Sequence, residues 1–317
     1  MPRYRSRVFV LIAASLALVA CVNERSAGPT AVPPLTVSAS RSDVSRMDPL
    51  TGHEAHVFYA RGQGARPASS PDMSWHGGPV MHSAATAAIF WGTSWSNSSF
   101  VSDKVSGMDA FYGGFGKSHY AGTSDEYTDA TGAVTSTVPY LGHFVDPGVS
   151  LNHAPQVSDI VGEVCSVLTS NGAAPVSNGF YMVYTDRSRG GHQYCAWHSY
   201  GSCGGVQIQV AFSFNLDGDA GCDPVDTQTG HSQGLAAIAN VSAHELSEAR
   251  TDPELNAWYD AGGAENGDKC AWTFNVPYVT FANRSIWKLQ GEWSNAAYDS
   301  QTGYPNRSGQ KGCLDGR

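Results

Sequence analysis

Apolar residues recur along the chain at two spacings, and each spacing predicts a different kind of element. Alternation of apolar and polar residues over 206–214 is typical of a half-buried strand. Short apolar runs predict further strands over 87–91 and 180–184. Two later runs, over 277–281 and 285–289, predict a hairpin.

Helical spacing of apolar residues predicts helices over 157–169 and 232–250. Ser232 is suited to cap the start of the second helix, and Pro253 is suited to end it. The predicted elements are a mix of strands and helices, and glycine and asparagine are abundant. The sequence therefore predicts an α+β fold with a mixed sheet, packed helices and many loops.

The first twenty residues have the pattern of an export signal. Three arginines precede an apolar run over residues 8–20, which is too short to span a bilayer as a helix, a task that takes ~20 residues. The run ends at Leu18-Val19-Ala20-Cys21, which resembles the lipobox of bacterial lipoproteins. We therefore expect residues 1–20 to be removed and Cys21 to carry a lipid anchor on an extracytoplasmic, membrane-attached protein.

Composition divides the remaining chain in two. Residues 21–72 are rich in Ser, Pro, Ala, Gly and Arg and show no lasting apolar period, so they predict a flexible tether. Residues 73–317 are long enough for one large domain with a substantial core.

Charge and cysteine content limit the choice of function. The formal net charge is −9 and no basic cluster is present, so nucleic acid is not expected as a partner. Six cysteines follow Cys21, and none of them are spaced as CxxC. An even number in an exported domain predicts three disulfides, whose pairing the sequence does not determine. These cysteines are Cys165, Cys195, Cys203, Cys222, Cys270 and Cys313.

The helix predicted over 232–250 carries an unusual arrangement of acids. At about 100° per residue, Glu245, Glu248 and Asp252 lie beside the apolar stripe rather than opposite it, and Arg250 lies on the predicted outer face. The acids also crowd the helix C-terminus, where the dipole disfavours negative charge. Something positive is expected to offset them, and a bound cation would do so.

The spacing at this helix suits a metal ion. His244 and Glu248 are four residues apart, so both project from one side of the helix. Zinc accepts both imidazole nitrogen and carboxylate oxygen. Glu245 would then be the general base, following the logic of the HExxH zinc motif with glutamate replacing the second histidine.

A downstream loop supplies further candidates, with Glu265 and Asp268 as a third ligand and its support. Two alternatives remain. The acids are also hard oxygen ligands suited to calcium, although His244 argues against that ion. In the other alternative the acids form a structural network, in which Glu248 or Asp252 caps loop amides and His244 is a buried core residue.

Several motifs resemble those of the Exordium-like, or phosphate-induced, proteins, which are secreted plant cell-wall proteins. The motifs are HELSEARTDP at 244–253, NAWYD at 256–260, HGGPVM at 76–81 and CAWH at 195–198. This resemblance implies secretion and a cell-surface location, and it implies no settled activity. The segment 265–270 is also similar to stretches in bacterial zinc-peptidase-like proteins, which implies a zincin-like architecture.

Two functions are compatible with these features. The first is a zinc-dependent hydrolase acting as a metallopeptidase, with His244, Glu248 and Glu265 as ligands, Asp268 or Asp252 in support, and Glu245 as base. Its substrate would be a peptide or a cell-surface polymer. The second is a non-catalytic cell-surface protein of the Exordium-like type that binds a wall polymer or a partner. Metal analysis separates the two.

Overall fold

The structure is a computed structural model that describes residues 47–64 and 71–316. The predicted signal peptide, Cys21 and much of the predicted tether lie outside the described residues. All described residues belong to one unit of the chain, Ser42–Arg317. In the described ranges, no helix combines the length and apolar composition that crossing a bilayer requires.

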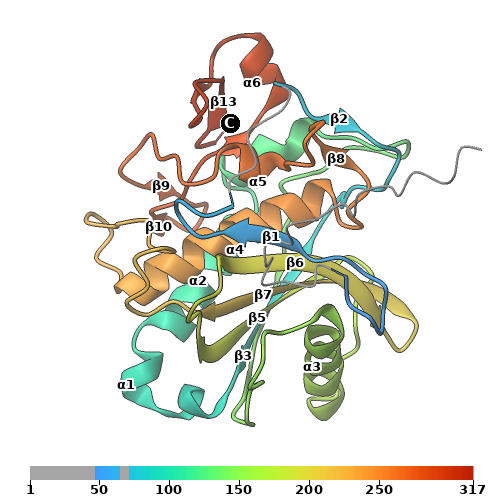
Figure 1. The fold of residues 1–317 in the computed structure, drawn as a ribbon, viewed down its shortest axis with the longest axis vertical. Coiled ribbons are helices and arrows are strands. Elements are labelled where there is room, and N and C mark those ends of the chain that lie inside the picture. Colours follow the sequence, from blue (N-terminus) through green and yellow to red (C-terminus); the bar gives the residue numbers. More distant parts are fainter. Residues whose placement is uncertain (1–46, 65–70, 317) are drawn as a thin grey trace, which may run out of the picture. The chain divides into compact units, whose positions relative to one another are not determined.

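Six strands form a central mixed sheet (Figure 1). Neighbouring strands β7, β5, β3 and β4 are parallel, whereas β6 is antiparallel to both β1 and β7. In spatial order the strands are β1 (His56–Tyr59), β6 (Tyr194–Cys203), β7 (Val206–Asn215), β5 (Gly179–Ser188), β3 (Ala85–Trp91) and β4 (Tyr140–Asp146). The predicted strands correspond to β3, β5 and β7, and the α+β class with a mixed sheet is confirmed.

Helices cover both faces of this sheet. α4 (Gln233–Thr251) crosses one face with α2 (Lys104–Phe115) beside it, and α3 (Val157–Ser170) packs on the opposite face (Figure 1). The cap predicted for α4 is present, because Ser232 Oγ accepts a hydrogen bond of 3.1 Å from the backbone N–H of Leu235. Both predicted helices are therefore confirmed, and α4 is placed against the strands that carry the candidate site.

Short elements make up the rest of the described chain. The predicted hairpin is confirmed, because β9 (Val279–Thr280) pairs with β10 (Ile286–Trp287). The others are β2 (Ser74–Trp75), β8 (Trp258–Tyr259), β11 (Glu292–Trp293), β12 (Tyr304–Pro305), β13 (Lys311–Leu314), α1 (Ser98–Val101), α5 (Asn266–Lys269), α6 (Asn295–Asp299) and the 3₁₀ helices η1 (Thr93–Ser96) and η2 (Ala121–Glu126).

All six predicted cysteines form disulfides. The pairs are Cys165–Cys203, Cys195–Cys222 and Cys270–Cys313. Three disulfides in one domain are typical of an extracytoplasmic protein, because the cytosol keeps thiols reduced.

The structure differs from the sequence prediction at the start of the domain. Residues 56–59, inside the predicted tether, form β1, which pairs with β6 at the edge of the sheet. The folded part therefore begins before residue 73. Four strand residues among many Pro, Ser and Gly residues are too short a run to show a lasting apolar period.

The environment of α4 also differs from prediction. Every residue from Gly234 to Thr251 is buried, including Arg250 on the expected outer face. The Arg250 guanidinium donates hydrogen bonds to the backbone carbonyls of Ala121 and Thr135. The helix wheel located the apolar stripe, but it had no information on the later segments that cover the other side.

Candidate metal centre

The C-terminal half of α4 supplies a histidine and two acids to the interior. His244, Glu245 and Glu248 are all fully buried. The His244 ring stacks on Phe58 of β1, with ring centroids 3.7 Å apart and planes inclined by 16°. Since α4 packs against β1 and β6 of the sheet, its buried polar side chains lie close to these two strands.

These two strands each contribute a histidine. His56 of β1 and His198 of β6 occupy directly opposed positions in the antiparallel pair, and their ring centroids are 5.5 Å apart. His198 is fully buried, whereas the His56 side chain retains 17% exposure. Strand register therefore places two imidazoles beside the acids of α4.

A loop and the short helix α5 complete the cluster. Glu265 immediately precedes α5, and Asp268 lies within it. The backbone N–H of Asp268 donates a hydrogen bond of 2.9 Å to Glu248 Oε1, which fixes α5 against α4. This arrangement is consistent with the prediction that the downstream loop brings Glu265 and Asp268 to the helix.

Two groups of three side chains in the described part of the chain have the proximity that a metal ion requires. One is His198, Glu248 and Glu265, and the other is His56, Glu248 and Asp268. The described residues thus include buried His, Glu and Asp side chains that could hold a metal ion.

In the first group, one donor atom of each side chain is free of hydrogen bonds. His198 Nε2 lies 3.6 Å from Glu248 Oε2 and 3.4 Å from Glu265 Oε2, and these three buried atoms have no hydrogen-bond partner. Zinc bonds of ~2.1 Å in a tetrahedral site place ligand atoms about 3.4 Å apart. The observed separations match that spacing, and buried polar atoms are rarely left without a partner.

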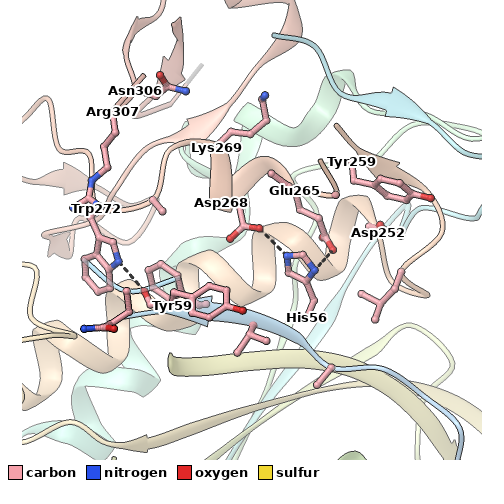
Figure 2. A pocket seen from close by; sticks show the side chains of 18 of the residues that line it. His56, Tyr59, Asp252, Tyr259, Glu265, Asp268, Lys269, Trp272, Asn306 and Arg307 are labelled. Carbon is pink, nitrogen blue, oxygen red and sulfur yellow. Dashed lines mark hydrogen bonds and ion pairs between the residues drawn. The ribbon is translucent and has the colours of Figure 1, made fainter. Parts of the chain in front are cut away.

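In the second group the donor atoms already contact each other. His56 Nε2 is hydrogen-bonded to Asp268 Oδ2 at 2.8 Å, and His56 Nδ1 lies 3.2 Å from Glu265 Oε1 (Figure 2). His56 Nε2 is also 3.9 Å from Glu248 Oε2. His56 therefore acts as a bridge between carboxylates in this structure.

The electrostatics of the cluster reflect an excess of acid. Burial, followed by the neighbouring carboxylates, raises the pKa values of Glu245, Glu248 and Glu265. Burial alone would lower the pKa of His56, but Asp268 and Glu248 raise it overall. Burial alone would likewise raise the pKa of Asp268, and His56 lowers it overall. A buried cation would stabilise the ionised glutamates.

A cavity of about 470 Å³ opens beside the cluster. His56, Glu265 and Asp268 line it, together with Asp252 and Tyr259 (Figure 2). Aromatic side chains of Phe58, Tyr59 and Trp272 line another part of its wall. The cavity is large enough to hold a small molecule, or one side chain of a peptide, next to the candidate metal ligands.

The remaining predicted site residues have different surroundings. Glu245 is not among the side chains that line this cavity, and neither of its buried carboxyl oxygens has a hydrogen-bond partner. Asp252 Oδ1 accepts backbone hydrogen bonds of 2.6 Å from Asn256 and Ala257, as expected of a structural cap. Burial raises the pKa of Asp252 to about 6.

Sequence reasoning did not identify His56 and gave His198 little weight. His56 lies in the segment interpreted as a tether, and its only signal was the apolar run Val57-Phe58-Tyr59 that follows it. His198 belongs to the CAWH motif at 195–198, where the sequence allows a metal ligand or a transition-state donor but favours a packing or hydrogen-bonding role. The Glu248, Glu265 and Asp268 candidates do converge, whereas His244 contacts Glu248 without belonging to either three-residue group.

Comparison with family models, curated proteins and solved structures gave no match to this chain. The geometry of the cluster therefore supplies the support for a functional proposal.

Proposed function

We propose that this chain is a zinc-dependent hydrolase that acts on peptides and holds the ion with His198, Glu248 and Glu265. The observation that supports this most strongly is the convergence of three buried atoms that lack hydrogen-bond partners, one from each residue. Catalytic zinc sites commonly use three protein ligands of these types and keep one position open. An imidazole among the donors favours zinc over calcium.

The chain's own residues supply the other parts of such a site. A bound zinc ion would act as a Lewis acid on a substrate carbonyl. Asp268 orients His56 at the edge of the cavity by accepting its Nε2 proton at 2.8 Å. The cavity wall of Phe58, Tyr59 and Trp272 would exclude water from an apolar substrate side chain.

Two groups are candidates for the general base. Glu245 remains the base proposed from the motif, and neither oxygen of its buried carboxyl has a hydrogen-bond partner. Burial, followed by Glu248 and Asp268, raises the pKa of this carboxyl. His56 is the alternative, because it lies at the cavity and is paired with a carboxylate. The cavity-facing position favours His56, whereas the helix motif favours Glu245.

Metal analysis of the purified protein tests the proposal. We expect one zinc ion per chain in the wild type and loss of stoichiometric zinc in His198→Gln. His82→Gln is a matched control, because His82 also contacts a carboxylate, Asp129 at 3.1 Å, but is 43% exposed. Equal zinc content in His198→Gln and the wild type would contradict the proposed ligand set.

Peptide hydrolysis by zinc-loaded variants then assigns the base. Glu245→Gln is expected to retain zinc and to lose at least about 100-fold in kcat, the usual contribution of a general base. His56→Asn is the comparison. If Glu245→Gln retains full activity and His56→Asn does not, the base is His56.

A non-catalytic Exordium-like surface protein is the second candidate. The observation that favours it is that Glu245 does not line the cavity. In this case the cluster would hold a structural ion or none, and the cavity would bind a polymer segment or a partner. Calcium or no metal in the purified protein, together with no hydrolysis, would support this alternative.

We also propose that the chain is attached to a membrane surface through a lipid on Cys21. This residue lies outside the described residues, and the support is the lipobox-like sequence before it. The three disulfides agree with an extracytoplasmic location.

A further inference from the structure

Gln290 provides a buried contact that bears on the role of His244. Its side-chain Nε2 donates a hydrogen bond of 2.9 Å to the Gly267 carbonyl and lies 3.0 Å from His244 Nδ1. Its Oε1 accepts a hydrogen bond of 3.1 Å from the backbone N–H of Trp272. The residue is fully buried, so water does not compete for these contacts.

The backbone partners determine the orientation of this amide. If the amide were reversed, its NH₂ group would face the Trp272 N–H and its oxygen would face the Gly267 carbonyl. Both contacts would be repulsive, because each would bring two donors or two acceptors together. The NH₂ group of Gln290 therefore points at His244 Nδ1.

This orientation fixes the proton on the imidazole. Nδ1 must present its lone pair to the Gln290 NH₂ group, since a proton on Nδ1 would set two donors against each other. A neutral imidazole with a bare Nδ1 carries its proton on Nε2. The carboxylate oxygens near this nitrogen are Glu248 Oε1, 3.1 Å from Nε2, and Asp268 Oδ1, 3.9 Å from it.

We propose that His244 is a positioning residue for Glu248 and not a metal ligand. This inference rests on the proposed function and changes the ligand set predicted from the helix motif. A protonated Nε2 has no lone pair for an ion. It would instead hold Glu248 Oε1, together with the Asp268 backbone N–H at 2.9 Å, so that Oε2 faces His198.

The alternative is that His244 binds the metal ion through Nε2. His244 Nε2 has no partner with hydrogen-bonding geometry in the structure. The same would be true of a nitrogen that binds a metal ion. The orientation of Gln290 decides between the two, because ligation through Nε2 needs a proton on Nδ1 where the amide NH₂ group already points. The Nε2 contact with Glu248 is then a close approach that can tighten when Oε2 is ligated.

Nitrogen NMR of the full-length chain labelled with ¹⁵N-histidine tests this assignment. Long-range ¹H–¹⁵N spectra, assigned with His244→Gln and His198→Gln, report the tautomer of each ring with and without ¹¹³Cd in place of zinc. We expect His244 to show the Nε2–H tautomer in both states and His198 to show coupling to cadmium. An Nδ1–H tautomer of His244, or its coupling to cadmium, would overturn the inference.

Two variants separate this inference from the proposed function. Gln290→Met removes the donor to Nδ1 and is expected to let His244 populate both tautomers, and an unchanged tautomer would show that Gln290 does not set it. His244→Gln is expected to bind zinc about 10–100-fold more weakly, as for residues that orient ligands, whereas His198→Gln should lose stoichiometric zinc. If the wild type binds no metal, the proposed function fails, but the tautomer of His244 is still measurable.

Discussion

At the scale of single residues, the cluster depends on one very close backbone approach. A Cβ atom at Gly267 would lie 2.7 Å from His244 Nδ1 and 3.0 Å from Glu248 Oε1. A real side chain there would displace the ring, the carboxylate or the α5 backbone. Glycine at this position is therefore what allows α5 to bring Asp268 against α4.

Gly267→Ala is expected to disturb the cluster more than the whole fold. Overpacking at a tight buried position costs about 1–3 kcal/mol of stability. The clash would also move Glu248, so zinc affinity should fall. Gly113→Ala in α2 is a suitable control, because nothing lies within 4 Å of the corresponding Cβ position. Calorimetric zinc titration and urea unfolding measure both effects, and equal zinc affinity in the two variants would contradict this role for Gly267.

The site residues predicted from the sequence come into contact in a different way from those that were missed. His244 and Glu248 meet through helix spacing, which the sequence shows directly. Glu265 and Asp268 follow in a nearby loop. His56 and His198 meet only through the register between β1 and β6, which are far apart in the chain. No local pattern records such a pairing, so the imidazoles of the site were not predictable as a set.

At the scale of elements, the position of α4 between other layers explains its composition. The sheet lies on one side, and η2, α5 and β10 contact the helix elsewhere. Small residues such as Ala237, Ala239 and Ala243 allow this close packing on all sides and are nearly or fully buried. Periodicity predicted the bounds of the helix well, but burial of its polar residues depends on segments whose placement is a tertiary property.

On the opposite face of the sheet, α3 carries a carboxyl group that should make stability depend on pH. Burial and the neighbouring Asp146 raise the pKa of Glu163 to about 8, against 4.5 for an ordinary glutamate. Between those two pH values the unfolded chain releases a proton that the folded chain keeps. The contribution of Glu163 to stability is therefore fully present below about pH 4.5 and is lost as pH rises through about 8.

Glu163→Gln removes this titration while keeping the size of the side chain. We expect the unfolding free energy of the wild type to fall relative to that of the variant as pH rises from 5 to 8, and to change little above pH 8. The size of this fall depends on how far the pKa of Glu163 is raised in the folded protein. Urea unfolding of both proteins over this range measures the difference. A stability difference that stays constant with pH would show that Glu163 ionises normally in the folded protein.

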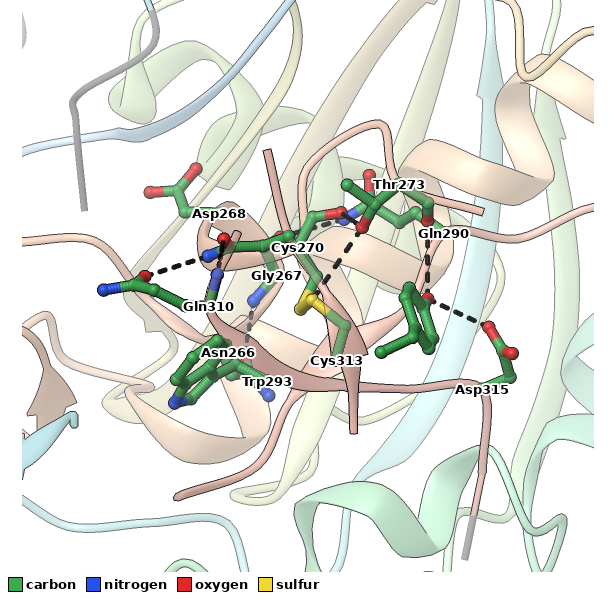
Figure 3. The surroundings of a disulfide bond; sticks show 12 residues. Asn266, Gly267, Asp268, Cys270, Thr273, Gln290, Trp293, Gln310, Cys313 and Asp315 are labelled. Atoms are coloured by element: carbon green, nitrogen blue, oxygen red, sulfur yellow. Dashed lines mark hydrogen bonds between the residues drawn. A yellow bond between two sulfur atoms is a disulfide. The ribbon is translucent and has the colours of Figure 1, made fainter. Parts of the chain in front are cut away.

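At the scale of the whole molecule, the disulfides hold different parts of the chain to the sheet and to one another. Cys165–Cys203 joins α3 to the end of β6. Cys270–Cys313 joins the end of α5 to β13, and Gly267 and Asp268 lie next to it (Figure 3). Since α5 is only four residues long, its own hydrogen bonds are too few to fix the carboxylates it carries.

Removal of Cys270–Cys313 is therefore expected to weaken metal binding as well as stability. The bonds Cys270–Cys313 and Cys165–Cys203 close loops of similar length, 43 and 38 residues, so each should contribute about 4 kcal/mol in the loop-entropy model. Paired Cys→Ser substitutions at 270 and 313 should lower the unfolding free energy by about this amount. They should also reduce zinc affinity, because the backbone of Asp268 is no longer anchored.

The same substitutions at 165 and 203 are the control. They should lower the unfolding free energy by a similar amount and leave zinc affinity close to that of the wild type. Zinc titration of both variants under folding conditions compares them, and equal losses of affinity would mean that the bridge next to α5 has no special role in holding the metal centre.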